Sequence, residues 1–132
     1  MSKNQPLSGY EYLRTQDALN AHVVVSIADT KGNITYVNDN FCQISGYERD
    51  ELLGQNHRIL KSGQHPPEFY DDMWQTISSG EIWTGEVCNR NKNGGIYWVK
   101  ATITPFLDEL GRPYKYVSYR TDISKIKTQE QS

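Results

Sequence analysis

The residues with the greatest capacity for chemistry are three histidines and two cysteines. His22, His57 and His65 follow no metal-binding spacing, and neither Cys42 nor Cys88 belongs to a Cys-x-x-Cys pair, which predicts two reduced thiols. The sequence also lacks a glycine-rich phosphate loop and any recognisable spacing of a Ser/His/Asp triad or of paired carboxylates. These patterns give no support for an enzyme.

Composition narrows the class of protein further. The chain has 132 residues, the usual size of one domain, and aromatic residues make up 11% of it, which argues against intrinsic disorder. The formal net charge of -2 excludes a generally basic surface for nucleic acid. No apolar run approaches the ~20 residues that cross a bilayer, and residues 1–6 lack the apolar core of a secretory signal. We therefore expect a cytoplasmic domain without membrane insertion.

Two strands and a helical middle form the first half of the chain. The β-branched run 22–29 ends in a turn signal, and alternation over 33–38 predicts a second strand, so the two form a hairpin. Apolar residues over 39–56 follow helical spacing interrupted by glycines, which predicts short helices. The clearest helix spans 66–80, because prolines open it and apolar residues recur every four positions along it.

The second half of the chain is predicted to form β-strands. Strands are predicted at 83–91, 96–105 and 114–122, with turn residues between them. Two strands, a helical middle and three strands predict an α+β fold. We expect one five-stranded antiparallel sheet, with helices on one face and a ligand cavity between the sheet and helix 66–80.

These elements divide the chain into a domain and two flanks. Residues 1–20 are predicted to form an N-terminal flanking segment with a short helix. The domain itself spans 21–124, and residues 125–132 begin a C-terminal linker helix.

Four motifs in this order resemble those of a PAS sensory domain. They are residues 34–41 (ITYVNDNF), 45–56 (SGYERDELLGQN), 92–99 (KNGGIYWV) and 120–124 (RTDIS). The resemblance covers the chain from about Tyr10 to Ser124 and implies a PAS fold. It also implies a sensor module that regulates an attached output domain, such as a kinase or a cyclic-di-nucleotide enzyme.

A narrower resemblance, to the FAD-binding redox sensors of the aerotaxis-receptor and nitrogen-fixation-regulator type, rests on residues 73–77, 80–85 and 89–94. It implies non-covalently bound FAD and a response to redox state or oxygen. Ser26, Trp74 and Asn89 match positions that line the flavin pocket of that subgroup. His57 stands where the nitrogen-fixation regulator has a glutamate, and also where flavin-based light sensors need a cysteine, so the photoadduct chemistry of those sensors is excluded at this position.

The residue types at these positions suit a flavin ring, which needs an apolar slot and hydrogen-bond partners for its polar edge. The amide of Asn89 both donates and accepts, Trp74 and Trp83 could stack on the ring, and Ser26 could meet its N5 atom. If the ligand is FAD rather than FMN, Arg58 or Lys61 could meet its diphosphate.

Plainer interpretations stay open. Trp74 could be a core residue, Trp83 a strand-edge packing residue, and Asn89 a surface or turn residue. Ser26 could bond its own backbone, and His57 could be an exposed loop histidine or a metal or haem ligand. The alternative for the whole chain is a cofactor-free PAS module for dimerisation and relay. We expect a homodimer formed through the N-terminal segment in either case.

Overall fold

The computed structural model describes residues 22–131. The predicted helix within residues 1–20, and the dimer contact predicted for that segment, lie outside the described residues.

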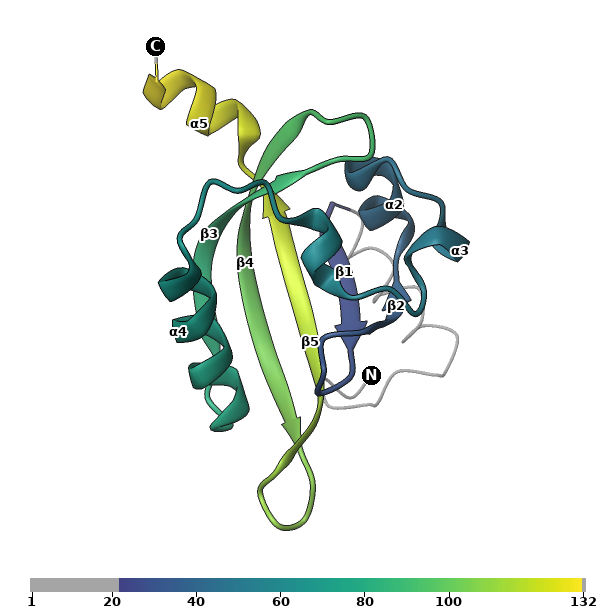
Figure 1. The fold of residues 1–132 in the computed structure, drawn as a ribbon, viewed down its shortest axis with the longest axis vertical. Coiled ribbons are helices and arrows are strands. Elements are labelled where there is room, and N and C mark those ends of the chain that lie inside the picture. Colours follow the sequence, from purple (N-terminus) through teal and green to yellow (C-terminus); the bar gives the residue numbers. More distant parts are fainter. Residues whose placement is uncertain (1–21, 132) are drawn as a thin grey trace, which may run out of the picture.

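A five-stranded antiparallel sheet forms the centre of the molecule, in the strand order β2-β1-β5-β4-β3 (Figure 1). The strands are β1 (Val24–Ala28), β2 (Ile34–Val37), β3 (Trp83–Arg90), β4 (Ile96–Leu107) and β5 (Pro113–Asp122). Strand β1 pairs with β5, so the first and last strands of the chain are neighbours in the middle of the sheet. The predicted fold class is confirmed.

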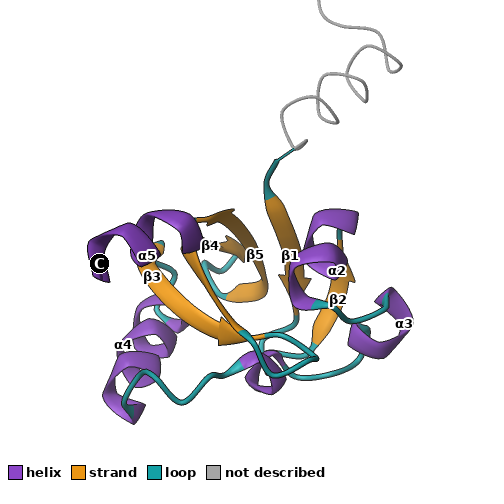
Figure 2. Cartoon of the chain, turned by 90° about the horizontal axis from the view of Figure 1, so that it is seen from above, coloured by secondary structure: helices purple, strands orange, loops and turns teal. Residues whose placement is uncertain are grey.

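Helices cover one face of this sheet (Figure 1). They are α2 (Asp39–Ser45), α3 (Arg49–Leu52), the 3-10 turn η1 (His57–Leu60) and α4 (Pro67–Ser78). Helix α5 (Ser124–Gln131) follows β5 and leaves the sheet at the C-terminal end of β5, beside the start of β4 (Figure 2). The helix predicted at 66–80 and the short helices predicted within 39–56 are therefore present.

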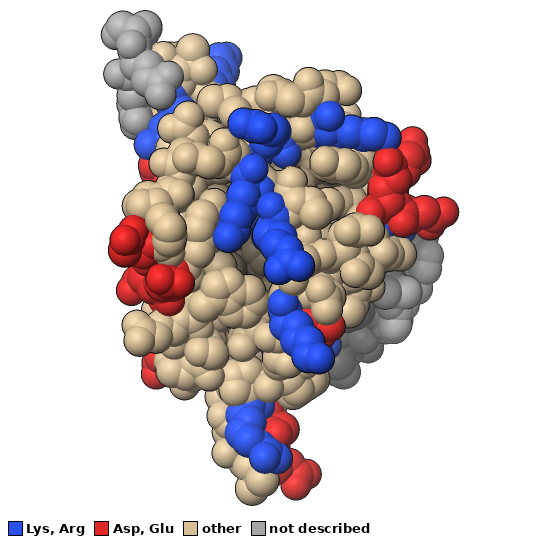
Figure 3. Space-filling view, viewed as in Figure 1, with Lys and Arg blue, Asp and Glu red and all other residues tan. Residues whose placement is uncertain are grey.

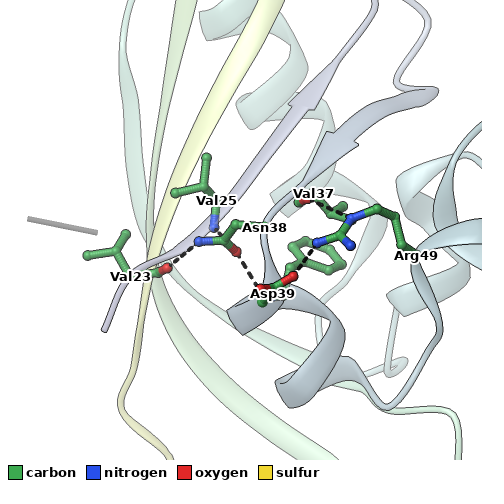
Figure 4. Close-up of polar contacts among 7 residues, drawn as sticks. Val23, Val25, Val37, Asn38, Asp39 and Arg49 are labelled. Carbon is green, nitrogen blue, oxygen red and sulfur yellow. Dashed lines mark hydrogen bonds and ion pairs between the residues drawn. The ribbon is translucent and has the colours of Figure 1, made fainter. Parts of the chain in front are cut away.

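Asn38 attaches the first of these helices to the sheet (Figure 4). Its side-chain oxygen accepts hydrogen bonds from the backbone N–H groups of Phe41 and Val25, both at 3.0 Å. Its side-chain nitrogen donates to the carbonyl oxygen of Val23 at 2.8 Å. One asparagine thus caps α2 and holds the start of that helix against β1, as an N-cap residue with a further tertiary contact.

Within residues 22–131, buried apolar side chains form two core clusters. The first core lies between the sheet and the α2–α3–η1 segment and contains Val24, Ile34, Val37, Phe41, Leu52 and Leu60. The second core lies between α4 and the sheet and contains Ile77, Trp83, Ala101, Ile103 and Tyr116.

Within residues 22–131, no helix has the length and apolar character needed to span a membrane.

Candidate functional site

A cavity of about 270 Å³ lies between the sheet and the helices η1 and α4. This volume is close to the lower end of the roughly 300–1,000 Å³ that small-molecule sites occupy. The sheet contributes Ser26, Ala28, Val87, Asn89, Ala101, Ile103, Tyr116, Ser118 and Arg120 to its wall. The helices and loops contribute Lys31, Gly32, Asn56, His57, Arg58, Leu60, Lys61, Tyr70, Met73, Trp74 and Ile77.

Strand alternation places a row of polar side chains on the cavity face of the sheet. Successive residues of a strand point to opposite faces, so Tyr116, Ser118 and Arg120 of β5 share one face. Ser26 of β1 lies directly opposite Ser118 in the antiparallel ladder. The middle of the sheet therefore offers two hydroxyl groups and a guanidinium to whatever occupies the cavity.

Ser26 joins the last strand to η1 through its hydroxyl group. Arg120 Nη1 donates a hydrogen bond to Ser26 Oγ at 2.9 Å, and the same oxygen lies 3.2 Å from His57 Nε2. Ser26 is fully buried, so these contacts replace the water that its hydroxyl would otherwise bind. A ligand that recruits this hydroxyl must compete with both neighbours.

His57 is held in its neutral form. Burial and the positive charge of Arg120 lower the pKa of His57 from 6.5 to about 3. Its ring also packs edge-on against Phe41, with ring centroids 5.9 Å apart. His57 is also one of the residues that line the cavity. It is a neutral hydrogen-bonding group at this wall.

Arg120 is a buried cation with apolar and neutral neighbours. It is 9% exposed, and its Cζ lies 5.3 Å from the centroid of the Phe41 ring, a cation–π distance. Burial lowers the pKa of Arg120 to about 10, and it raises the pKa of Tyr97 nearby to about 12. At neutral pH the arginine is therefore charged and the tyrosine is not.

Two hydroxyl groups in the cavity wall are buried without a hydrogen-bond partner in the described part of the chain. They are Ser118 Oγ and the phenolic oxygen of Tyr70. Burying a polar group without a partner costs about 1–3 kcal/mol, so such groups are uncommon in native proteins. Their position in a cavity wall points to a ligand with polar groups of its own.

Basic side chains surround the mouth of the cavity. Lys31, Arg58 and Lys61 line it and are exposed, and the Lys61 ammonium lies 4.1 Å from the centroid of the Tyr70 ring. Figure 3 shows Lys and Arg side chains gathered beside a hollow on this face of the molecule. The mouth is therefore suited to the anionic part of a ligand whose remainder lies inside.

The structure brings four of the five predicted site residues to the cavity wall. Ser26, His57, Trp74 and Asn89 all line it. The Trp74 ring packs closely against the β1–β2 turn, where Gly32 has a φ of 86° and a Cβ would lie 3.1 Å from that ring. A larger residue at this turn would be strained, and the indole would have to shift slightly to make room for it.

Trp83 is not among the lining residues. Its indole folds back over Gly85, where a Cβ would lie 2.5 Å from the ring. It meets the ring of Phe69 edge-on at a centroid distance of 5.5 Å, and it belongs to the second core. The glycine two positions along β3 opens a space on the sheet, and the indole fills that space instead of turning toward the ligand.

Sequence reasoning missed Arg120, Ser118 and Tyr70. Alternation over 116–120 carried a signal for the first two, because a serine and an arginine share a strand face with Tyr116. Only the packing decides that this face is the buried one.

Within residues 22–131 no group of three or more His, Cys, Asp or Glu side chains is placed to hold a metal ion.

A family model described as "PAS fold" matches residues 34–120. The matched region contains η1, α4 and the strands that carry most of the cavity wall. It thus covers more than half of the chain, including the second core and all of the first core except Val24.

Several curated proteins are similar in sequence. A nitrogen fixation regulatory protein of Klebsiella pneumoniae is 42% identical over 111 residues, covering 84% of this chain and 22% of that protein. The aerotaxis receptor of Escherichia coli is 39% identical over 117 residues, covering 87% of this chain and 23% of the receptor. The biofilm dispersion protein BdlA of Pseudomonas aeruginosa is 40% identical over 103 residues, covering 77% of this chain and 25% of that protein. The chain spans about a quarter of the length of these relatives.

Solved structures share the fold at lower identity. An RNA-binding light-oxygen-voltage receptor aligns over 98% of this chain and 39% of its own, with a TM-score of 0.79 and 24% identity. A LOV domain from a blue-light activated histidine kinase of Erythrobacter litoralis aligns over 76% of this chain and 95% of its own, with a TM-score of 0.69 and 24% identity. The narrower resemblance noted in the sequence is confirmed by the names of the relatives, and the structures show the fold alone.

Proposed function

This chain belongs to the PAS family, and we propose that it is a sensor domain that holds FAD non-covalently in its cavity and reports redox state or oxygen to an attached output domain. Relatives named as a nitrogen fixation regulator and an aerotaxis receptor support this reading at the level of a sensory signalling domain. The proposal for this chain depends on one observation, the cavity with buried and unpartnered hydroxyl groups in its wall.

The residues of the cavity fit a flavin by type. Trp74, Met73 and Ile77 of α4 supply an apolar wall on one side, and Ala101 of β4 leaves room on the other. Asn89 supplies a donor and an acceptor for a polar ring edge. A volume of about 270 Å³ suits the ring system, while a diphosphate would leave through the mouth.

Each group of residues then has a distinct task. When bound, the isoalloxazine ring supplies reversible electron transfer, with a proton taken up at its N5 atom. Asn89 and Ser118 orient the polar edge, and Trp74 excludes water from the ring face. Lys31, Arg58 and Lys61 hold the phosphates at the mouth.

Strand β5 offers a direct route from the cavity to the C-terminal helix. Ser118 and Arg120 lie in the cavity wall, and Asp122 follows two residues later at the strand end. The Asp122 carboxylate accepts a hydrogen bond from the Ser124 N–H at 2.9 Å, and the Ser124 hydroxyl accepts one from the Trp98 N–H at 2.9 Å. We therefore expect a change in the hydrogen-bond partners of Ser118 and Arg120 to alter the contacts at the start of α5.

The first test is the absorbance spectrum of purified protein, before and after incubation with FAD or FMN. We expect flavin bands that bleach with dithionite and return in air, with FAD retained better than FMN. A protein that stays free of flavin after incubation with FAD contradicts the proposal. Such a result would leave a cofactor-free dimerisation and relay module, and a Soret band would indicate haem instead.

The residue assignments have a separate test. Trp74→Ala and Asn89→Ala should each weaken FAD binding at least about tenfold, since each removes a wall or an edge contact. Asn93→Ala, in the exposed β3–β4 turn, is the matched control and should bind FAD like the parent protein. Equal affinity of all three variants would reject these assignments while leaving the cavity proposal standing.

A further inference from the structure

Within residues 22–131, every charged residue that lines the cavity is a cation. Lys31, Arg58 and Lys61 are exposed at the mouth, and Arg120 is buried in the wall; none of the described lining residues is an aspartate or a glutamate. The three exposed cations are solvated without a ligand and need no further explanation. Arg120 does need an explanation, because it is buried and water cannot solvate its charge as it solvates the three exposed cations.

The structure gives Arg120 no acidic partner within residues 22–131. A guanidinium has five N–H donors, and in the described part of the chain Arg120 donates a side-chain hydrogen bond to Ser26 Oγ. The groups that face it are the Ser26 hydroxyl from β1, the neutral His57 ring from η1, the Phe41 ring from α2 and the neutral Tyr97 from β4. A buried charge without a counter-ion costs several kcal/mol, which an anionic ligand group would recover.

Ser118 is a second and independent indication at the same place. It lies two residues from Arg120 on the same face of β5, is 5% exposed, and its Oγ has no hydrogen-bond partner in the described part of the chain. Its position opposite Ser26 puts it beside the oxygen to which Arg120 donates. An unpartnered hydroxyl and an uncompensated cation thus share one stretch of wall.

We propose that Arg120 and Ser118 form a subsite for a ligand group that gains negative charge, so that the cavity binds the reduced, anionic form of a flavin ring more tightly than the oxidised form. The proposal rests on the proposed function and specifies which redox form the protein favours. Reduction by an external reductant such as dithionite adds two electrons and one proton to the ring, which leaves one net negative charge on it. Arg120 and Ser118 stabilise that charge by Coulomb attraction and hydrogen bonding, while the neutral oxidised ring gains less.

This preference sets the redox poise of the protein. Whatever binds the reduced form tighter than the oxidised form raises the midpoint potential by linkage. For a two-electron couple, each tenfold difference in affinity corresponds to about 30 mV. Arg120 would therefore make the bound flavin easier to reduce than free FAD.

The experiment compares FAD affinity in both redox forms, together with the midpoint potential, for R120Q, R120K and R112Q. R120Q keeps hydrogen-bond donors but removes the charge, so it should weaken the reduced complex at least about tenfold more than the oxidised one and lower the midpoint by about 30 mV or more. R120K should retain much of the parent's preference. R112Q removes an arginine that pairs with Asp108 in the exposed β4–β5 turn, and it should change neither value. An affinity ratio of R120Q within twofold of the parent's overturns the proposal.

A measurement on the parent protein keeps the test decisive even if R120Q does not fold. The absorbance of the fully reduced protein is followed from pH 8 to pH 5, beside free reduced FAD. The proposal requires the bound ring to stay anionic at pH values where the free ring takes up a proton; protonation at the same pH or higher overturns it. A parent protein that binds neither redox form of FAD instead rejects the proposed function, so the two failures are distinguishable.

Discussion

The two cores of this domain sit on the same sheet but are packed to different degrees. In the first core, Val37 and Leu52 are completely buried and Phe41 is 1% exposed. In the second core, Trp83, Ile103 and Tyr116 retain 5–8% exposure, and Ile103 and Tyr116 face the cavity. Among the described residues, the first core borders the cavity only through Leu60, whereas four members of the second core line it: Ile77, Ala101, Ile103 and Tyr116.

This difference separates the tasks of holding the fold and receiving a ligand. Close packing gives the first core its full share of dispersion and hydrophobic contacts. The second core gives up part of that gain at the cavity, and it carries buried polar groups that lack partners in the described part of the chain. A ligand in the cavity would supply both the missing contacts and the missing hydrogen bonds. The comparison can be tested with matched substitutions on the two sides.

The largest effect should come from a leucine pair. Leu52→Ala in the first core should lower the free energy of unfolding toward the upper part of the range of about 2–5 kcal/mol for such changes, because nothing can fill the void. Leu60→Ala, at the edge of the same core, should lower it less, since Leu60 borders the cavity on one side. Urea unfolding of both variants measures the difference. A larger loss for Leu60→Ala would contradict looser packing beside the cavity.

Ligand binding should act on the second core. FAD at a hundred times its dissociation constant should raise the free energy of unfolding by about 2.7 kcal/mol, because it binds the folded state alone. Hydrogen exchange should then slow most in η1, α4 and β5, which form the cavity wall, beyond the global effect seen in α2. Equal local protection of α2 and α4 would show that the ligand does not complete the second core.

Acid should destabilise the cavity side through His57. Its pKa is about 3 in the folded state and 6.5 ordinarily, so below pH 6.5 the unfolded chain binds a proton that the native chain excludes. Its contribution to stability is therefore complete above pH 6.5. Below that pH, this one group should lower the free energy of unfolding by up to about 1.4 kcal/mol per pH unit.

The control for this pH effect is His57→Gln, in which that part of the slope should disappear. His65→Gln should change the slope less: burial also lowers the pKa of His65, but its ring packs against Phe69 outside the cavity wall. Unfolding titrations at pH 7, 6 and 5 give the slopes. An unchanged slope in His57→Gln would mean that the His57 ring is solvated and is not buried in the cavity wall.

The smallest effect should distinguish two buried serines. Ser45→Ala on the first-core side removes a hydroxyl that accepts a hydrogen bond from the Tyr47 N–H, and it should cost about 1 kcal/mol. Ser118→Ala removes a hydroxyl without a partner in the described part of the chain, so the ligand-free protein should be unchanged or slightly more stable. A clear loss for Ser118→Ala would mean that its hydroxyl is already satisfied by water.

Much of the fold was accessible to prediction because it depends on local pattern. The turn residues between them located β3, β4 and β5, and the proline start with apolar residues every four positions located α4. The pairing of β1 with β5 was not predicted, since strand order depends on contacts between distant segments. The 3-10 turn η1 was not predicted, because four residues carry too little periodicity to identify it.

The candidate site divides in the same way. Residue types and spacing selected Ser26, His57, Trp74 and Asn89, all of which reach the cavity wall. The same reasoning selected Trp83, whose indole instead fills the space above Gly85. An aromatic side chain can turn either way from its strand, and only its neighbours decide which way is occupied.

The sequence by itself determined the order of the elements, the faces of the strands and the absence of a thiol beside Asn56, since each is a property of residue type and spacing. Tertiary structure alone decided that Ser26 meets Arg120, a residue 94 positions away, and that this arginine is buried without a carboxylate within the described residues. The reason is physical: burial and charge pairing arise when strands from the two ends of the chain become neighbours. A local sequence pattern carries no information about contacts between residues so far apart in the chain.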